Sequence, residues 1–466
     1  MSVGTSQNWF APMVDFLKEL PKEALKSLCK KANYTSLKAG DVLFCQDDPA
    51  DYLYVVTSGT LVVMLQPSGS DKGRMIALIK KGEVIGEVAV FGRSSRSADV
   101  VALRDTELLR INRKDFEQLV ERFPKISITI AQIMAARLNE STRAQTLKIV
   151  PKVITFIAST DGVDVVDAAN RLAEMLRSGS GFKVFVQGER DDELDGAKLG
   201  RLEDEHDLVI LCAIPKDSRW LNRCTRQSDR ICLIANGNQP FFPEIPEQFL
   251  DNAHYKKLVD LYLLHPESLV CPLNTQQLLD SISFNRFFHI RSERQRDWER
   301  WARVLTGRGI GIVFSGGGAR AYAQIGVLRA LEEVDLPIDF VGGASMGGII
   351  AAGMAIGWSV DEIQERIHDS FVVSNPLSDY RLPLKGLVAG RKVERLLDKS
   401  FGAREIPDLW LPFICVSTNL TTADVHVHET GKVCHALRAS ISLPGILPPV
   451  VTEEGVLVDG GVINNL

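Results

Sequence analysis

Hydrophobic and polar residues alternate over short, closely spaced stretches in the first third of the chain. The alternation covers residues 52–65, 74–80 and 100–111, and Gly59 marks a turn within the first of them. A period of two is typical of half-buried β-strands, and short strands at this spacing favour a barrel or a sandwich. A helical period follows at residues 113–147.

Within that helical stretch, apolar residues recur at the spacing of one helix face. Such a stripe packs against another protein surface. Two partners are open: the β-structure of the same chain, or the same stripe of a second copy in a homodimer. The stripe consists of Ile126, Ile130, Ile133, Met134 and Leu138.

Between residues 150 and 305 the pattern changes to continuous apolar runs separated by helical segments. The runs at 152–159 and 206–214 are typical of buried parallel strands, and 164–178 has the period of a crossover helix. We therefore expect an α/β domain. Its sequence lacks the G-x-x-x-x-G-K-[ST] phosphate loop. We assign it no chemistry and expect a spacer or docking role.

Two charged stretches lie in this middle section. Residues 188–207 are expected to form a solvated loop and helix face rather than a metal site. Residues 291–303 are predicted to form an amphipathic helix that leads into the last section. Its Trp298 and Trp301 are expected to pack inside this connection, with contact to lipid headgroups as the alternative.

The last section repeats a strand, a glycine turn and a helix. Strands are predicted within 309–317 and 338–344, and helices within 319–334 and 346–357. This order favours a parallel sheet covered by helices. The uncharged run 340–360 is long enough to cross a bilayer, but its glycines make a membrane helix the less favoured interpretation.

Composition narrows the class of protein. The 466 residues suffice for two to four domains, and the formal charge of −5 gives no drive toward nucleic acid or an anionic membrane. The eight cysteines form no C-x-x-C pair, and the N-terminus has no signal-peptide pattern. We therefore expect a cytoplasmic protein with reduced cysteines, without a metal site and without a nucleic-acid partner.

A candidate nucleophile lies at the second predicted strand–helix bend. Residues 343–347, Gly-Ala-Ser-Met-Gly, form a G-x-S-x-G motif around Ser345. Glycines on both sides let the backbone turn sharply and expose the serine hydroxyl above the sheet edge. The motif alone is a weak signal, because stretches of small residues produce it by chance.

A glycine block ends the preceding strand. Gly316, Gly317 and Gly318, followed by Arg320, would present backbone N–H groups at the start of a helix. Such donors stabilise the oxyanion that forms in acyl transfer. A tight turn or a phosphate cradle is the alternative reading of the glycines.

The serine needs a base, and Asp459 is the candidate. It follows a short apolar strand and precedes two glycines, from where it could take the Ser345 proton directly. A turn aspartate in a hairpin is the equally weighted alternative. The three histidines nearest in sequence are expected to be surface or packing residues: His426, His428 and His435.

In this order and spacing, GGGAR, GASMG and DGG resemble the patatin-like phospholipases. The resemblance covers the last third of the chain and includes the block 436–450. It implies a three-layer α/β/α fold and a Ser-Asp dyad that hydrolyses acyl esters of lipids, with Ser345 as nucleophile and Asp459 as acid. It also implies that Gly316, Gly317 and Gly318, with Arg320, form the oxyanion block.

Segments 219–234, 288–293 and 302–320 are similar to the linker and domain entry of neuropathy target esterases and their bacterial relatives. That subgroup is implied to act as lysophospholipases and to carry N-terminal cyclic-nucleotide-binding modules. The expected domains are therefore a nucleotide-binding domain at 12–145, an α/β linker at 150–305 and a patatin-like domain at 309–466.

The first section indeed resembles a cyclic-nucleotide-binding β-roll. Its phosphate-binding cassette is matched by Gly86, Glu87, Arg96 and Ser97. A helix starting near Glu87 would offer N–H groups to a cyclic phosphate, and Arg96 would neutralise its charge. Glu87 would accept the ribose 2′-hydroxyl, and Ser97 would add a phosphate or base contact. Either cAMP or cGMP is expected, and a structural Glu-Arg pair is the alternative.

Together these features predict a multidomain α/β protein: a regulated serine esterase acting on lysophospholipids or phospholipids at a membrane surface, without a catalytic cofactor. It is expected to associate peripherally with the inner face of the membrane. The alternative is an inactive nucleotide-sensing protein that binds lipid or a protein partner. Patatin-like domains normally continue past the DGG block, whereas this chain ends seven residues after Asp459. A shortened domain with a poorly held aspartate is a further expectation.

Overall fold

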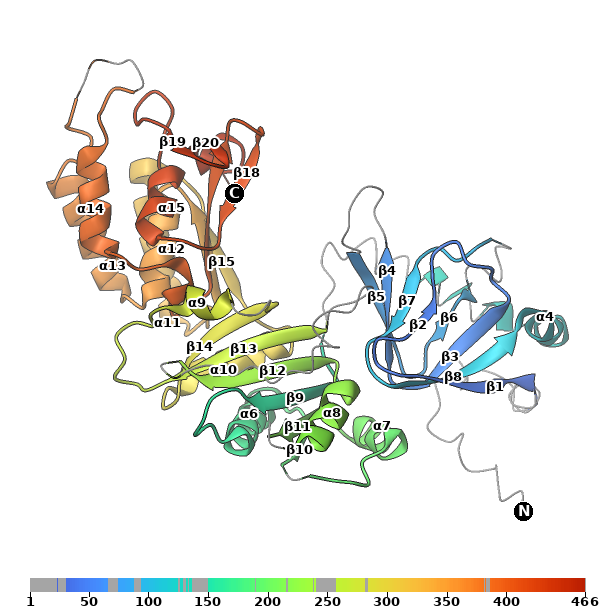
Figure 1. Ribbon diagram of the computed structural model, residues 1–466. Helices are drawn as coiled ribbons and strands as arrows, with labels where there is room; N and C mark the ends of the chain where they lie inside the picture. The colour runs from blue at the N-terminus through green and yellow to red at the C-terminus, as the bar shows by residue number, and fades with distance from the viewer. Residues whose placement is uncertain are drawn as a thin grey trace. The chain divides into compact units, whose positions relative to one another are not determined.

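The computed structural model describes most of the chain in two compact units. The first unit reaches Ile234 and includes residues 257–260, and the second comprises most of the chain from Leu261 onwards. Figure 1 shows the elements of each unit. The described residues are 31–65, 74–87, 94–124, 150–237 without 189 and 215–216, 257–380 without 281–283, and 386–465, with a few single residues and short pieces between them.

The first unit opens with a β-roll of two four-stranded antiparallel sheets. Strand β8 pairs with β1 and β3 in one sheet, and β7 pairs with β2 and β4 in the other. Val56, Val100 and Leu108 from both sheets fill the space between them and are almost inaccessible to solvent. The predicted short-strand structure is confirmed. The strands are β1 (Asn33–Leu37), β2 (Val42–Phe44), β3 (Tyr52–Ser58), β4 (Thr60–Leu65), β5 (Arg74–Lys80), β6 (Val84–Ile85), β7 (Asp99–Ala102) and β8 (Thr106–Asn112).

Helix α4 (Arg113–Arg122) follows the last strand and packs on the roll. Beyond it, Ile126 is fully buried in the same core cluster, and Met134 packs at the edge of that cluster. At these two positions the predicted apolar stripe contacts its own roll. Three further residues of the stripe lie outside the described residues, so the homodimer seam stays a prediction: Ile130, Ile133 and Leu138.

The first unit continues as a parallel α/β domain with strand order β10-β11-β9-β12. The predicted strands and the crossover helix are confirmed. Strand β10 was missed because it is only four residues long and mostly half-buried, so its run of three apolar residues is too short to indicate a buried strand. The elements are β9 (Val153–Ala158), α6 (Val165–Ser180), β10 (Val184–Gln187), α7 (Gly196–Glu205), β11 (Leu208–Ala213), α8 (Ser218–Gln227) and β12 (Arg230–Asn236).

The second unit starts with the end of β13 and includes α10, in which both predicted linker tryptophans are packed. Trp298 and Trp301 are each at most 2% exposed. The Trp301 ring stacks on Tyr262 with 4.0 Å between ring centres. The packing interpretation is therefore confirmed over contact with lipid headgroups. The elements are β13 (Leu258–His265), α9 (Thr275–Leu279), β14 (Arg286–Arg291) and α10 (Gln295–Leu305).

The rest of the second unit is built on a mixed sheet with strand order β15-β16-β17-β20-β19, and β18 also pairs with β17. Strands β15, β16 and β17 are parallel, as the repeated strand–turn–helix pattern predicts. The pairs of β17 with β18 and with β20 are antiparallel. The strands are β15 (Gly311–Phe314), β16 (Phe340–Ala344), β17 (Phe413–Asn419), β18 (Asp424–His428), β19 (Val450–Thr452) and β20 (Gly455–Asp459).

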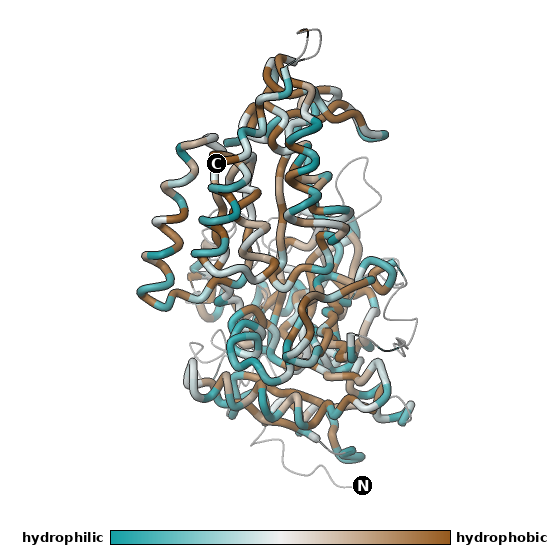
Figure 2. Tube along the Cα trace, turned by 90° about the vertical axis from the view of Figure 1, so that its left-hand side faces the viewer, coloured by the Kyte–Doolittle hydropathy of each residue, from teal (hydrophilic) through white to brown (hydrophobic). Residues whose placement is uncertain are grey.

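Helices cover one face of this sheet (Figure 1). Helix α12 is the central one, because nearly all of its side chains are buried against β15, β16 and β17. The outer helices are amphipathic, and Figure 2 shows hydrophilic and hydrophobic segments alternating along them. The helices are α11 (Tyr322–Glu333), α12 (Met346–Ile356), α13 (Val360–Ile367), the π-helix η3 (His368–Val373), α14 (Arg391–Phe401) and α15 (Val433–Ser440), with 3₁₀ turns η2 (Gly318–Ala321), η4 (Ile406–Asp408) and η5 (Gly460–Val462).

The predicted fold class, a multidomain α/β chain with an N-terminal β-roll, is confirmed. The uncharged run 340–360 is not one helix but strand β16 followed by helix α12. Among the described residues, no helix is both long enough and apolar enough to cross a membrane.

A buried chain of imidazoles joins β13 and β14 to the segment before β17. His265 Nε2 lies 2.9 Å from His289 Nδ1, and His289 Nε2 lies 2.8 Å from the carbonyl of Pro407. The carbonyl can only accept, so His289 donates to it from Nε2. With both rings neutral, His289 accepts at Nδ1 from His265 Nε2. Burial, together with Arg291, lowers the pKa of His265 to about 4, and burial lowers the pKa of His289 to about 3.

This chain predicts a loss of stability in mild acid. Both pKa values lie below the ordinary value of 6.5, so the histidines favour the folded state fully above that pH. Their contribution is lost as the pH falls from 6.5 toward 4. Thermal unfolding followed by tryptophan fluorescence should show a falling midpoint over this range, and the variant His289→Gln should show a shallower fall. Equal slopes for both proteins would contradict the assignment.

Candidate active site and nucleotide site

Ser345 lies on the bend between β16 and α12, in the context that the G-x-S-x-G motif requires. Its backbone has φ 53° and ψ −125°, a conformation that L-residues rarely adopt. Glycine is required on both sides of Ser345 because neighbouring backbone atoms lie too close to allow a side chain. A Cβ atom on Gly347 would lie 2.3 Å from the carbonyl oxygen of Phe314, and one on Gly343 would lie 2.6 Å from the backbone of Gly347.

The sheet register brings Asp459 to this bend. Strand β18 occupies one edge of β17, so β16 and β20 pair in succession along the other edge. Ala344 pairs with Val416, and Asp459 pairs with the next residue, Ser417. The residue after Ala344 is therefore adjacent to Asp459, although the two lie 114 positions apart in sequence.

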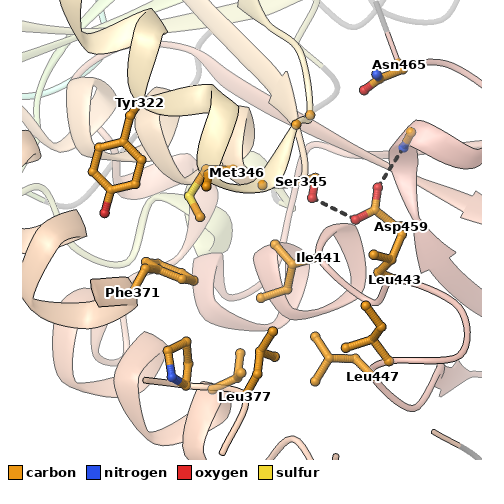
Figure 3. Close-up of a pocket in the computed structure, with 18 of the residues that line it drawn as sticks. Tyr322, Ser345, Met346, Phe371, Leu377, Ile441, Leu443, Leu447, Asp459 and Asn465 are labelled. Carbon is orange, nitrogen blue, oxygen red and sulfur yellow. Dashed lines mark hydrogen bonds between the residues drawn. The ribbon is translucent and has the colours of Figure 1, made fainter. Parts of the chain in front are cut away.

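The two side chains form a hydrogen bond. Ser345 Oγ donates to Asp459 Oδ2 over 2.7 Å, and the Gly461 N–H donates to Asp459 Oδ1 over 2.9 Å (Figure 3). The aspartate is only 6% exposed. One carboxylate oxygen is thus held by the backbone, and the other faces the hydroxyl. This is the arrangement in which a carboxylate can act as the base for a serine nucleophile.

Ser440, at the end of α15, fixes the bend at Ser345 through hydrogen bonds. Its hydroxyl accepts the Ser345 N–H over 2.8 Å and donates to the carbonyl of Val416 over 2.6 Å. The side chain is completely buried. Sequence analysis did not assign Ser440 a role, and its only signal was membership of the block 436–450. The hydroxyl links the strained backbone of Ser345 to the central strand β17.

The glycine block lies beside Ser345. A Cβ atom on Gly316 would be 3.1 Å from Ser345 Cβ, and Gly318 has φ 53°. Gly316, Gly317 and Gly318 all line the cavity that contains Ser345. Arg320 is exposed and is not among the lining residues, but its backbone N–H donates to the carbonyl of Gly317 over 3.1 Å. The structure thus brings the three glycines to the serine and leaves the Arg320 side chain outside.

A largely apolar cavity of about 610 Å³ opens over the serine and the aspartate. This volume is typical of small-molecule sites. Ser345, Asp459 and Asn465 lie at one end, whereas the Tyr322 hydroxyl lies at the other; mostly hydrocarbon and aromatic side chains line the remainder (Figure 3). The apolar wall consists of Tyr322, Met346, Phe371, Val372, Pro376, Leu377, Val393, Ile441, Leu443, Ile446, Leu447 and Val462.

The predicted nucleotide site is partly assembled in the β-roll. Arg96 is 3% exposed and donates to the carbonyls of Tyr52 over 2.7 Å and Gly86 over 3.3 Å. Its guanidinium carbon lies 4.1 Å from the centre of the Phe44 ring. Burial lowers the pKa of Arg96 below its ordinary value. The charge is held by neutral carbonyls and a ring face, which a phosphate could replace as partners.

The neighbouring cassette residues fit the same site with one exception. Gly86 has φ 87°, and a Cβ atom there would lie 2.4 Å from the Arg96 guanidinium. Glu87 is buried at 4% exposure, and its charge raises the pKa of Arg96 against the effect of burial. Ser97 is exposed. The structure therefore brings Gly86, Glu87 and Arg96 together and leaves Ser97 at the surface.

A buried ion cluster joins the β-roll to the α/β domain within the first unit. Arg104, just after β7, donates to both carboxylate oxygens of Glu203 over 2.8 and 2.7 Å and lies 3.3 Å from Asp229. Burial alone would lower the pKa of Arg104, but the two acids raise it above its ordinary value. Glu203 belongs to the charged stretch that was expected to be solvated, and at this residue the expectation is wrong.

Three parts of the chain match known protein families. Residues 34–123 match the cyclic nucleotide-binding domain, and residues 312–466 match the patatin-like phospholipase family. Residues 196–307 match a domain described as the neuropathy target esterase family P-loop like domain. The chain is also 30% identical to an uncharacterised NTE family protein of Mycobacterium tuberculosis, with 99% of this chain and 78% of that protein aligned.

The chain therefore belongs to the neuropathy target esterase (NTE) family. A patatin-like phospholipase domain-containing protein 6 from human is 29% identical over 93% of this chain. Lysophospholipase NTE1 of Lodderomyces elongisporus is 27% identical over 98% of it. The chain spans little more than a third of the length of these two relatives, 36% and 38%.

Within this NTE family chain, Ser440 is expected to support catalysis through the geometry of Ser345. Replacing Ser440 by alanine removes the acceptor of the Ser345 N–H, so the nucleophile loses its fixed orientation. We expect ester hydrolysis to fall about 10–100-fold in kcat with little change in KM. Steady-state kinetics on a soluble ester test this.

The matched control is Ser442→Ala. Ser442 is equally buried, but its hydroxyl bonds with Arg438. Its contact with Asp459 is through the backbone carbonyl, which accepts the Asp459 N–H over 3.0 Å and is kept in the variant. A similar loss of kcat in both variants would assign the effect to packing instead.

Proposed function

We propose that this NTE family chain is a serine lipid acyl hydrolase that uses Ser345 and Asp459 as a catalytic dyad. The observation that supports it is the 2.7 Å hydrogen bond between Ser345 Oγ and Asp459 Oδ2 at the polar end of an apolar cavity. This bond also favours a working enzyme over the inactive sensor, because it sets a buried carboxylate to accept the proton of a half-buried serine hydroxyl that lines the cavity.

In the proposed reaction, Asp459 accepts the Ser345 proton while Oγ attacks the ester carbonyl of a bound lipid. Backbone N–H groups of the glycine block at 316–318 stabilise the negative charge on the carbonyl oxygen. The intermediate collapses, the alcohol of the headgroup fragment leaves with the proton from Asp459, and an acyl-serine remains. Asp459 then takes a proton from a water molecule that attacks the acyl-serine, and it returns this proton to Ser345 Oγ as the fatty acid leaves. No metal or organic cofactor takes part.

The proposed substrate class is the lysophospholipids, with phospholipids as the wider group. One cavity of about 610 Å³ leads away from Ser345, and its wall is hydrocarbon. This suits one acyl chain better than two. The name of the fungal relative, a lysophospholipase, agrees with the same class.

We further propose that the enzyme works at a membrane surface, bound peripherally on the cytoplasmic side. Four cavity-lining residues are also exposed apolar side chains: Val372, Leu377, Leu443 and Val462. Exposed hydrophobic groups around a cavity are suited to contact with lipid. A substrate chain could pass between them without entering water.

Regulation by a cyclic nucleotide is the third part of the proposal. The support is that one short strand, β7, connects Arg96 to Arg104. It begins three residues after Arg96 and ends two residues before Arg104. A phosphate that draws Arg96 from the carbonyls of Tyr52 and Gly86 would disturb the start of β7. Arg104, just after the other end of β7, donates two hydrogen bonds to Glu203 of the α/β domain. Either cAMP or cGMP fits this reasoning.

The hydrolase proposal predicts that Ser345→Ala and Asp459→Asn each lower the release of fatty acid from lysophosphatidylcholine by about 10³-fold or more. The double variant should lose little beyond the single ones, because the two groups act as one unit. Fatty-acid release by the purified chain measures this. Wild-type rates in Ser345→Ala would contradict the proposal.

The nucleotide proposal predicts that the wild-type chain binds cAMP or cGMP in calorimetry and that Arg96→Ala binds about 10–100-fold more weakly, since a charged hydrogen-bond donor is lost. The control is Arg113→Ala, which removes a surface arginine paired with Glu117 on α4. Absence of heat with both nucleotides in the wild type would contradict binding.

A further inference from the structure

A second, smaller cavity lies behind the wall of the active-site cavity. It has a volume of about 20 Å³, so it is nearly filled by its own lining. The walls are almost entirely hydrocarbon and aromatic side chains from α12, α13, η3 and α14. Its residues are Ile349, Trp358, Arg366, Ile367, Ser370, Phe371, Pro376, Val393, Leu396, Leu397, Ser400 and Phe401.

The two cavities share a partition. Phe371, Pro376 and Val393 line both of them. Pro376 and Val393 are buried, whereas Phe371 is half-buried. In Figure 3 Phe371 lies in the apolar part of the active-site cavity, away from the Ser345–Asp459 hydrogen bond. The largest of the three partition side chains is therefore the Phe371 ring.

The backbone that carries this ring is unusual. Phe371 belongs to the π-helix His368–Val373, in which the N–H of Ser374 donates to the carbonyl of Asp369 over 2.9 Å. Single π-turns are rare and occur often at functional sites. The extra residue in the turn changes the direction of the side chains that follow α13. It is this turn that carries the Phe371 ring between the two cavities.

The far end of the small cavity is closed by an aromatic pair. Trp358 and Phe401 stack with 5.4 Å between ring centres, and the Arg366 guanidinium lies 4.4 Å from the centre of the Trp358 ring. The only charged residue in the lining is thus engaged with a ring face. At about 20 Å³ the space holds about one water-sized group, so a chain terminus enters only if the Phe371 ring turns aside. The apolar lining then favours a hydrocarbon terminus over a polar group.

We propose that Phe371 sets the acyl-chain length that the enzyme accepts, and that the small cavity is the subsite for the chain terminus of longer substrates. The inference rests on the proposed hydrolase function. A chain that fills the first cavity meets the Phe371 ring, and a longer chain must turn the ring aside to reach the space lined by Trp358 and Phe401.

The test is a size series at this position: Phe371→Ala, Phe371→Leu and Phe371→Trp. Each variant is assayed on lysophosphatidylcholines from decanoyl to eicosanoyl, and on a short soluble ester such as p-nitrophenyl butyrate. We expect the ratio of kcat/KM for the longest over the shortest lipid to rise by about tenfold or more in Phe371→Ala and to fall in Phe371→Trp. Phe371→Leu should lie between alanine and the wild type.

The matched control is Val373→Ala on the same π-helix. Val373 is 67% exposed and lines neither cavity, so its chain-length profile should equal that of the wild type. If Phe371→Ala fails to fold, the leucine and tryptophan variants still move the profile in opposite directions.

Two results would overturn the inference, and they differ. If all variants hydrolyse the short ester but the chain-length profile is the same across the series, Phe371 does not set chain length and the hydrolase proposal stands. If the wild type cleaves neither the short ester nor any lysophospholipid, both the proposed hydrolase function and the proposed subsite are wrong.

Discussion

The hydrogen bond between Ser345 and Asp459 is the interaction on which the proposed activity depends. It exists because β16 and β20 pair one after the other along the same edge of β17, so that the residue following one strand meets the last residue of the other. The strained backbone of Ser345, the close glycines and the hydroxyl of Ser440 all serve to hold one side of this contact. The Gly461 N–H holds the other side.

Each of the two units contains buried charged side chains that are paired. In the first unit, Arg104 of the β-roll is buried and pairs with Glu203 and Asp229 of the adjoining domain. Removing one partner would leave a buried charge unpaired. The second unit has ion pairs of buried aspartates as well, between Arg291 and Asp297 and between Arg303 and Asp339, beside the neutral imidazole chain from His265 to Pro407.

Much of the fold could be predicted from the sequence, because the patterns were strong. The alternation at 52–65, the apolar runs of the parallel strands and the glycines around Ser345 each require one local structure. Strand β10 and the π-helix at 368–373 could not be predicted: a short half-buried strand has no periodic signal, and a π-turn needs one extra residue that local sequence does not mark. The burial of Glu203 could not be predicted either, because it depends on Arg104, about a hundred residues away in the sequence. Ser440 lies in the block 436–450 that resembles the family. Only the structure shows that its hydroxyl bonds to the Val416 carbonyl of β17 and to the Ser345 N–H.

The most direct measurement is the site of covalent reaction with a fluorophosphonate, which modifies only serines that have an activated hydroxyl. Intact-mass and peptide mass spectrometry of the purified chain should find one adduct, on the peptide that contains Ser345, and the rate of its formation should collapse in Asp459→Asn. No adduct on Ser345 in the folded wild-type protein, or equal labelling rates with and without the aspartate, would contradict the account.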